Sequence, residues 1–378
     1  MTTRVHVLSD GFASPNGRGV VYPLLAERRA LADDGIEVGI YSMIDARGLR
    51  DCDLLVVDSK HFGGPLHGQP AFVIDTLGRL ADGPRALVWY DSTDSAGWIA
   101  GDVLAVVARY WKSQLLVDRG RYLSPLYGRR AYSDFYHRSA GVTDDQPADS
   151  AQVRDARHLA RLRLAWHSGL ADHGRWGPLR MAVWQRLPQL PALVPHLPRF
   201  TAPSAARPAA LAARMGTNYR LASVAWQRRA IVARLAGRVA TGKVGRGRYF
   251  AELRRSRAVL SPFGLGEITL KDFEAFIAGA ALVKPDMSHM ETWPDLFLQG
   301  ETMATFRWDL ADLEAVLDRL AISPRTTEAI AQAGQMRYRH FLAERDGRAA
   351  FREHVAVLVA DAIAGDEAPA PQAAGREF

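Results

Sequence analysis

The segment SPFGLGEITLKDFEAFIAGAALVKPD, residues 261–286, places glycines, carboxylates and a lysine at close spacing. Gly264 and Gly266 let the backbone approach a ligand closely, and the start of the helix expected after them favours a phosphate. Glu274, in the first or second turn of that helix, suits paired hydroxyls such as those of a ribose. Lys271 lies three residues earlier on the same helix face, where it can meet a diphosphate. The segment therefore predicts a nucleotide site.

A plainer explanation of the same residues stays open at this point. The Gly-Leu-Gly-Glu sequence can be a simple turn, with Glu267 placed favourably at the positive end of the helix. Glu274 can be one half of a surface ion pair with Lys271, which contributes little stability.

Basic residues are concentrated in the middle of the chain. Residues 1–150 hold 16 Lys/Arg and 19 Asp/Glu, whereas residues 151–250 hold 18 Lys/Arg and two Asp. Such a block attracts anions, although exposed helix faces rich in Arg would have the same composition. Within it, our candidates for diphosphate contact are Arg214 after a predicted strand, Arg228 on the next helix, and Lys243 in a glycine-containing loop.

The elements that must position these residues alternate between strand and helix patterns. In the first half, strands are expected at 4–9, 37–41, 52–59 and 86–90, and helices at 21–33, 71–81 and 152–164. Residues 162–174 are expected to form a further strand that runs into a glycine-containing loop. In the second half, strands are expected at 208–216, 258–263 and 281–286, and helices at 222–237, 248–257, 270–280, 310–320, 326–343 and 349–364. This alternation indicates an α/β protein with parallel sheets covered on both faces.

Length and composition fit two such units. The chain has 378 residues, 48% hydrophobic and 24% charged, as in soluble two-domain proteins. Prolines recur at residues 187–200, where we place the domain connection. We expect an N-terminal domain over 1–185, a C-terminal domain over 197–345, a returning helix over 346–364 and a disordered tail over 365–378.

Cysteine and histidine usage predicts neither a disulfide framework nor a metal site. Cys52 is the single cysteine, and the histidines are too sparse to form a ligand set. The N-terminus lacks the basic and apolar regions of a signal peptide, so we expect a bacterial cytoplasmic protein. Peripheral contact with the inner face of a membrane stays open.

The pattern SPFGLGE, followed by FEAFIAGAALVKPD, resembles the donor-binding segment of GT-B glycosyltransferases, especially the group 1 and exostosin-like enzymes. The resemblance covers about residues 200–345. It implies two Rossmann-like domains facing across a cleft, a C-terminal helix crossing back to the first domain, and a metal-independent hexosyltransferase without a cofactor. In that family two glutamates flank the loop and the helix start, and the second binds the ribose. Glu274 matches that position, whereas Glu267 departs from the family's spacing by one residue.

The resemblance also implies a base that deprotonates the acceptor hydroxyl. Asp91 and Asp94 follow the predicted strand ALVWY directly, and His167 with Asp172 form a second candidate pair. Asp residues at such positions also cap helices, so this explanation stays open. The loop SPNGRG, residues 14–19, is expected to line the acceptor side.

We therefore expect transfer of a sugar from a nucleotide-sugar to a glycan or lipid-linked saccharide, in polysaccharide biosynthesis. Two alternatives remain: a nucleotide-sugar epimerase or hydrolase on the same scaffold, and a non-catalytic scaffold that binds anions or glycans. No nucleic-acid partner is expected, because no motif combines aromatic and basic residues as nucleic-acid modules do.

Overall fold

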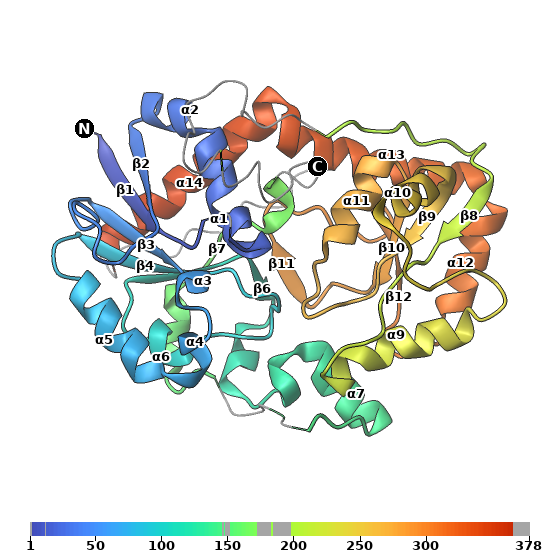
Figure 1. Cartoon of the computed structure of the whole chain (residues 1–378), viewed down its shortest axis with the longest axis horizontal. Helices are drawn as coiled ribbons and strands as arrows, with labels where there is room; N and C mark the ends of the chain where they lie inside the picture. Colours follow the sequence, from blue (N-terminus) through green and yellow to red (C-terminus); the bar gives the residue numbers. More distant parts are fainter. Residues whose placement is uncertain are drawn as a thin grey trace.

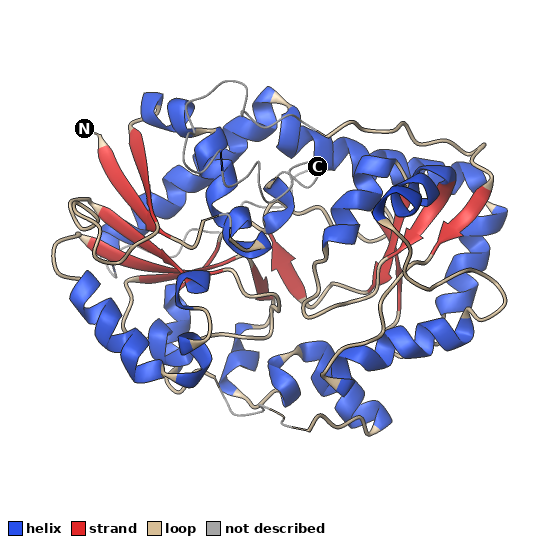
Figure 2. Cartoon of the chain, viewed as in Figure 1, coloured by secondary structure: helices blue, strands red, loops and turns tan. Residues whose placement is uncertain are grey.

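The computed structural model describes residues 2–11, 13–145, 147, 152–171, 183 and 198–365. Within these residues the chain forms two lobes, each built on a parallel sheet with helices on its faces (Figures 1 and 2). We call the six-stranded sheet with its helices the first lobe, and the four-stranded sheet with its helices the second lobe.

The first lobe has the strand order β2-β1-β3-β4-β5-β7, with every pair parallel. Its strands are β1 Thr3–Leu8, β2 Ile36–Tyr41, β3 Leu54–Asp58, β4 Ala86–Asp91, β5 Arg109–Lys112 and β7 Leu162–Leu164. Its helices are α1 Pro15–Ala26, α2 Arg28–Asp33, α3 Ser59–Phe62, α4 Pro65–Gly68, α5 Pro70–Leu80, α6 Gly101–Leu104 and α7 Ala131–Ala140. All residues of β3 and β4 are buried, as continuous apolar runs in a doubly covered sheet require.

The second lobe has the strand order β12-β10-β9-β8, also parallel. Its strands are β8 Ala209–Ala212, β9 Ser256–Leu260, β10 Ala281–Pro285 and β12 Met303–Phe306. Its helices are α9 Ala222–Arg234, α10 Arg246–Arg255, α11 Leu270–Ala278, α12 Leu313–Ile322 and α13 Pro324–Ala343.

The C-terminal helix α14, Arg345–Ala364, returns to the first lobe (Figure 1). Its apolar residues Phe351, Val355 and Leu358 share a buried cluster with β1 and β3. Polar contacts fix the same helix, because Asp361 accepts hydrogen bonds from Arg109 and Arg163, at 2.8 and 2.9 Å. The predicted fold class is therefore confirmed: two α/β lobes face each other across a cavity, and the last helix crosses back.

The lobes are also joined directly. Strand β6, Gln114–Leu116, pairs antiparallel with β11, Met290–Thr292, so that a two-stranded sheet spans the junction. Helix α7 packs against α9, and Ser223 of α9 donates a hydrogen bond at 2.6 Å to Asp144, which follows the end of α7.

Two sequence expectations need comment. The helix predicted at 152–164 is wrong, because residues 156–161 form a 3₁₀ helix, whereas the strand expected from residue 162 is confirmed by β7. Most of the predicted domain connection and all of the tail beyond Gly365 lie outside the described residues, so the domain boundaries stay predictions. None of the described helices combines the length and apolar character that a membrane crossing needs.

Candidate active site between the lobes

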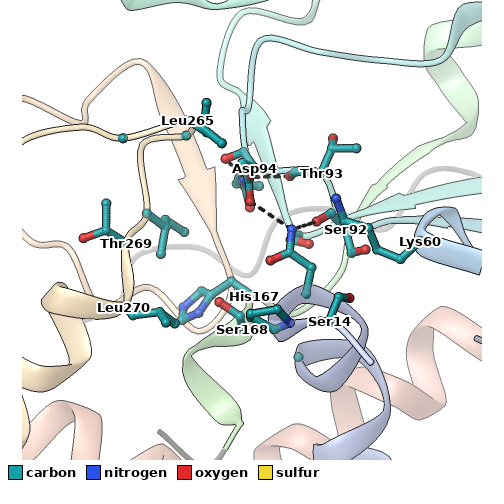
Figure 3. A pocket seen from close by; sticks show the side chains of 18 of the residues that line it. Ser14, Lys60, Ser92, Thr93, Asp94, His167, Ser168, Leu265, Thr269 and Leu270 are labelled. Atoms are coloured by element: carbon teal, nitrogen blue, oxygen red, sulfur yellow. Dashed lines mark hydrogen bonds between the residues drawn. The ribbon is translucent and has the colours of Figure 1, made fainter. Parts of the chain in front are cut away.

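A cavity of about 570 Å³ lies between the two lobes (Figure 3). The first lobe contributes the start of α1, Lys60 of α3, the loop after β4 and the start of β6. The second lobe contributes Tyr219, Arg228, the glycine loop after β9 and the start of α11. Carboxyl ends of strands from both sheets therefore face one space, which is where open α/β sheets bind ligands.

The second-lobe wall is the segment that the sequence singled out. Strand β9 ends at Leu260, the loop carries Gly264 and Gly266, and α11 begins at Leu270. At the helix start Asp272 accepts the amide of Thr269 at 2.8 Å, in a reciprocal capping box.

Asp272 is also a buried anchor for this helix start. It accepts a hydrogen bond from Ser261 at 2.5 Å and pairs with the Lys284 ammonium at 2.9 Å. Neither Asp272 nor Lys284 has exposed side-chain surface. The glycine loop and the amides at the start of α11 are thereby held toward the cavity.

The glycine loop touches the first lobe directly. A Cβ on Gly266 would lie 1.7 Å from the carbonyl oxygen of Asp94. The carbonyls of Gly264 and Leu265 accept hydrogen bonds from Tyr132 at 2.9 Å and Arg130 at 2.8 Å. Only glycine at position 266 permits this approach.

The first-lobe wall places a second helix start at the cavity. Ser14 caps α1 by accepting the amide of Gly17 at 3.0 Å, and Pro15 occupies the first turn. The loop at 14–19 that was expected to line the acceptor side is thus the start of α1, and it does line the cavity. Asn16 donates hydrogen bonds to the Ser92 carbonyl at 2.7 Å and to the Asp94 carboxylate at 2.9 Å.

Two cations line the cavity without a described carboxylate partner. Arg228 is buried and donates to backbone carbonyls, among them those of Phe263 at 2.6 Å and Gly216 at 3.2 Å. Its guanidinium also lies over the Tyr219 ring at 5.1 Å. Lys60 forms no ion pair with any residue that the structure describes. These positive charges and the two helix starts make the cavity attractive to an anion.

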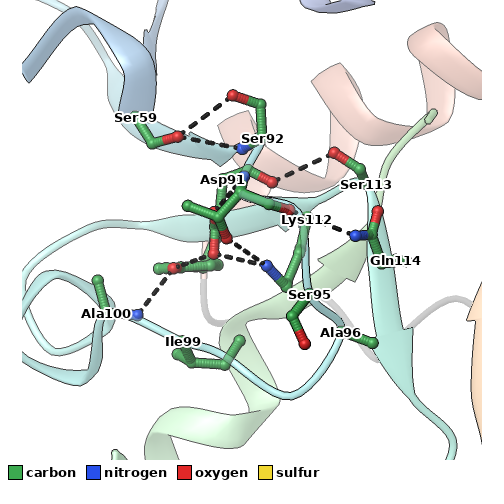
Figure 4. A network of polar contacts seen from close by, with 12 residues as sticks. Ser59, Asp91, Ser92, Ser95, Ala96, Ile99, Ala100, Lys112, Ser113 and Gln114 are labelled. Carbon is green, nitrogen blue, oxygen red and sulfur yellow. Dashed lines mark hydrogen bonds and ion pairs between the residues drawn. The ribbon is translucent and has the colours of Figure 1, made fainter. Parts of the chain in front are cut away.

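The predicted catalytic residues separate into three environments. Asp94 is half-buried and lines the cavity. Asp91 is fully buried and accepts hydrogen bonds from Lys112, Tyr110 and Thr93, at 2.8, 2.7 and 2.6 Å (Figure 4). This network accounts for Asp91 as a structural residue.

His167 lines the cavity but both ring nitrogens are engaged. Nδ1 accepts the amide of Gly169 at 2.9 Å, and Nε2 donates to the carbonyl of Pro294 at 2.9 Å. Burial lowers the pKa of His167 to about 4, although the Pro294 contact opposes this shift. The imidazole is therefore neutral near pH 7 without a free nitrogen for an acceptor proton. Its predicted partner Asp172 lies outside the described residues.

The side chains of Glu267 and Glu274 lie in different environments. Glu267 is fully buried and accepts hydrogen bonds from Ala96 at 2.9 Å and Ser95 at 3.2 Å, across the lobe junction. Glu274 is half-buried and accepts a hydrogen bond from Tyr249 of α10 at 2.8 Å. Burial raises the pKa of Glu274 above its ordinary value. Neither glutamate is among the residues that line the cavity.

The remaining predicted cations are not among the residues that line the cavity. Lys271 donates to the carbonyl of Arg214, and burial lowers the pKa of this lysine to about 7. The Arg214 guanidinium binds both oxygens of Glu252, at 2.7 and 3.0 Å. Lys243 is exposed and lies against Gly216, in the loop that follows β8. Among the predicted donor residues, Gly264, Gly266 and Arg228 line the cavity.

Sequence reasoning missed Lys60 and Gln114. Lys60 follows the buried strand β3 directly, at the same sheet edge as Asp94, and this position was its signal. Gln114 donates to the Asp94 carbonyl at 2.6 Å from a three-residue strand that has no sequence pattern. In the described part of the chain, no group of three or more His, Cys, Asp or Glu side chains could hold a metal ion.

Comparison with known proteins supports the resemblance. Residues 205–351 match a family described as glycosyl transferase-like, which confirms the resemblance to glycosyltransferases over this part of the chain. No curated protein matches the chain.

Several solved structures align with nearly the whole chain at low identity. HepE from Anabaena in complex with UDP-glucose is 10% identical, covers 95% of this chain and 99% of its own, and has a TM-score of 0.42. Sucrose-phosphate synthase from Thermosynechococcus elongatus is 13% identical, covers 95% and 100%, and has a TM-score of 0.41. A glycosyltransferase from Rickettsia africae is 7% identical, covers 94% and 98%, and has a TM-score of 0.41.

Proposed function

We propose that this protein transfers a hexosyl group from a nucleoside diphosphate sugar to a saccharide acceptor in the cavity between the lobes. The observation that carries the proposal is the convergence of two helix starts, Arg228 and Lys60 on one space, in a chain whose residues 205–351 match the glycosyl transferase-like family. Such a cavity suits the diphosphate of a donor and stabilises it as a leaving group.

In this proposal the chain's own cations neutralise the diphosphate. Arg228 is desolvated and held by carbonyls, so its charge acts at short range in a low-dielectric site. Lys60 approaches from the opposite lobe, so the leaving group is bound only when both lobes are in place. The proposal includes no metal or other cofactor.

Asp94 is the proposed base for the acceptor hydroxyl. It lines the cavity opposite the start of α11, and Asn16 holds one carboxylate oxygen at 2.9 Å (Figure 3). The carboxylate can therefore accept a proton while its orientation is fixed. The proposal keeps the cytoplasmic location, with peripheral membrane contact, and the glycan or lipid-linked saccharide acceptor expected from the sequence.

A thermal-shift panel of UDP, GDP, ADP and dTDP and their hexose conjugates tests donor binding. We expect one nucleotide series to raise the Tm, because a ligand at 100 times its Kd stabilises the folded state by about 2.7 kcal/mol. Lys60→Met should lose most of this shift, whereas Arg325→Met, an exposed arginine of α13 outside the cavity, should keep it. A panel without any stabilising nucleotide would overturn the proposal.

Turnover separates transfer from its alternatives. We expect release of the nucleoside diphosphate to depend on an added saccharide and to persist in EDTA. Release without any acceptor would instead support the hydrolase. Binding to glycans that is unchanged in Lys60→Met, without turnover, would support the non-catalytic scaffold.

We also propose the ribose contact expected of Glu274 from the sequence, and because Glu274 does not line the cavity this contact needs its own variant pair. Glu274 lies one turn beyond Leu270, which lines the cavity, and its carboxylate is bonded to Tyr249. We expect Glu274→Ala to weaken nucleotide binding about tenfold. Tyr249→Phe removes the same hydrogen bond but keeps the carboxylate, so it should bind nucleotide at least as well as the parent protein. Equal losses in both variants would assign Glu274 a structural role.

A further inference from the structure

A second hollow lies at the lobe junction, on the side of α7. It consists of two adjoining cavities of about 580 and 510 Å³, which share Phe135, His289 and Trp308. We call this hollow the aromatic groove. It shares no lining residue with the cavity between the lobes, and its first-lobe wall includes Leu116 of β6.

Two aromatic side chains, Phe135 and Trp308, line both cavities of the aromatic groove. Phe135 of α7 and Trp308 meet edge to face, with ring centroids 5.5 Å apart and planes at 83°. The Trp308 indole N–H donates to the carbonyl of Asp286 at 2.7 Å, which fixes the ring. Both side chains keep part of their surface exposed, so part of this aromatic pair is open to solvent.

The turn that carries Trp308 is strained and tightly bonded. Leu310 has a φ of 62°, in the left-handed region that a branched apolar residue rarely adopts. Asp309 accepts the amide of Ala311 at 3.0 Å, and Asp312 accepts the amide of Arg307 at 2.8 Å. Strain kept in place by such contacts is a feature of ligand-binding segments.

The rim offers hydrogen-bonding groups without a net positive charge. Asp134 forms ion pairs with Arg138 at 3.1 Å and with Arg121 at 3.7 Å. On the other side Arg307 binds Asp309 at 2.6 Å. Asp286 and Asp312 also line the second cavity, so carboxylates exceed cations there. An anionic ligand is therefore disfavoured, whereas hydroxyls find both donors and acceptors.

We propose that the aromatic groove binds a neutral saccharide. One face of a pyranose ring would lie on Trp308, with Phe135, whose ring plane is nearly perpendicular, against the edge of the sugar. Its hydroxyls would bond to the paired arginines and carboxylates at the rim. A fixed aromatic platform with a few polar groups is the usual composition of a small-molecule site. The proposal concerns binding alone and does not depend on the proposed transfer reaction. On β6, a single residue separates Gln114 of the cavity from Leu116 of the groove, so a bound glycan would be held close to the proposed transfer site.

Titration with maltohexaose, cellohexaose and chitohexaose tests the proposal, by calorimetry and by the NMR signal of the Trp308 indole N–H. We expect at least one of these glycans to bind saturably and to shift that signal. Trp308→Ala and Phe135→Leu should each weaken binding roughly tenfold. Ile322→Ala, an exposed residue of α12, should leave binding unchanged.

The variants also separate this proposal from the transfer proposal. Trp308→Ala should keep the nucleotide-induced rise in Tm, and Lys60→Met should keep glycan binding. Phe135→Leu retains an apolar side chain, so it provides a folded variant if Trp308→Ala does not fold. The proposal would be overturned if none of the three glycans bound up to its solubility limit, or if binding were equal in the parent protein and both groove variants.

Discussion

Asp91 and Asp94 are three residues apart, yet they lie in opposite environments. The Asp91 carboxylate lies 2.8 Å from the Lys112 ammonium, and both side chains are fully buried. Asp94 lies beyond the strand end, half-buried at the cavity, with Asn16 as its polar partner. The sequence DSTD makes the two carboxylates look equivalent, and only burial separates their roles.

Matched substitutions at the two positions should therefore have opposite effects. We expect Asp94→Asn to lower kcat by about 10²–10⁴-fold with little change in unfolding, because the proposed base is lost. Asp91→Asn should reduce the free energy of unfolding by about 3–5 kcal/mol, because Lys112 is left buried without its partner. Turnover assays and urea unfolding of both variants give the comparison. A stable Asp91→Asn protein with lost turnover would reverse the assignment.

His354 gives a pH dependence that can be isolated. Burial lowers the pKa of His354 to about 4, although its contact with the Leu164 carbonyl opposes this shift. Between the ordinary pKa of 6.5 and about 4, the unfolded chain binds a proton that the folded protein does not. The free energy of unfolding should therefore fall as the pH falls through this window, by up to about 1.4 kcal/mol per pH unit.

Subtracting the free energy of unfolding of His354→Gln from that of the parent protein cancels the contributions of the other titrating groups, because both proteins contain them. We expect the stability advantage of the parent protein to be larger at about pH 7 than at about pH 5. Urea unfolding at both pH values measures it. A difference that is constant with pH would show that His354 takes up its proton equally in both states.

At the scale of elements, the sequence predicted those with a clear period. The strand at 256–260, the glycine loop and the helix at 270–278 follow from an apolar run, turn residues and an amphipathic stretch. The short strands β5, β6 and β11 have three or four residues, too few to show a period. The segment at 152–164 is basic and has a helical period, but Arg163 binds Asp361 at 2.9 Å, a partner 198 residues away.

Some residues of the candidate site could be predicted from the sequence, and others could not. The glycines and Arg228 could be placed because they follow strand ends or lie on a clear helix. Glu267 could not, because its hydrogen bonds run to Ser95 and Ala96 of the other lobe. The five lysines of this arginine-rich chain offered an unused signal. Lys60 lines the cavity, Lys243 lies against Gly216 of the loop after β8, and Lys112, Lys271 and Lys284 have buried or partly buried polar contacts.

Gly266→Ala tests the contact between the glycine loop and the first lobe. The added Cβ would lie 1.7 Å from the Asp94 carbonyl oxygen, so the loop must move away from the β4 end. We expect a loss of about 1–3 kcal/mol in the free energy of unfolding, together with lower turnover. Gly242→Ala is the matched control, because no atom lies within 4 Å of its added Cβ. If denaturant unfolding gave similar free energies of unfolding for both variants, the close contact would be contradicted.

At the scale of the whole molecule, the lobes are not independent bodies joined by a linker. One buried apolar cluster includes Trp89 of the first lobe and Phe263 and Phe273 of the second. The β6–β11 sheet and the Glu267 hydrogen bonds cross the same junction. Helix α14 follows the second lobe in sequence, yet its apolar face completes the core of the first lobe.

These connections predict a single unfolding transition, and its Tm should depend on the ion pairs of Asp361. Asp361 lies on α14 and binds Arg109 and Arg163, whose side chains are 2% and 10% exposed. Asp361→Asn removes the carboxylate charge that two nearly buried guanidinium groups share, which should reduce the free energy of unfolding by about 3–5 kcal/mol. Because both lobes share the core, calorimetry should show one transition at a lower Tm, in the variant as in the parent protein.

Glu353→Gln is the matched control, since Glu353 is exposed on the same helix and should change the Tm little. If Asp361→Asn instead produced two separate transitions, the lobes would be energetically independent. The cavity would then be a gap between two domains that can separate. Because Lys60 and Arg228 belong to different lobes, nucleotide binding to the variant should in that case disappear at the first transition, whereas a coupled molecule loses it only on complete unfolding.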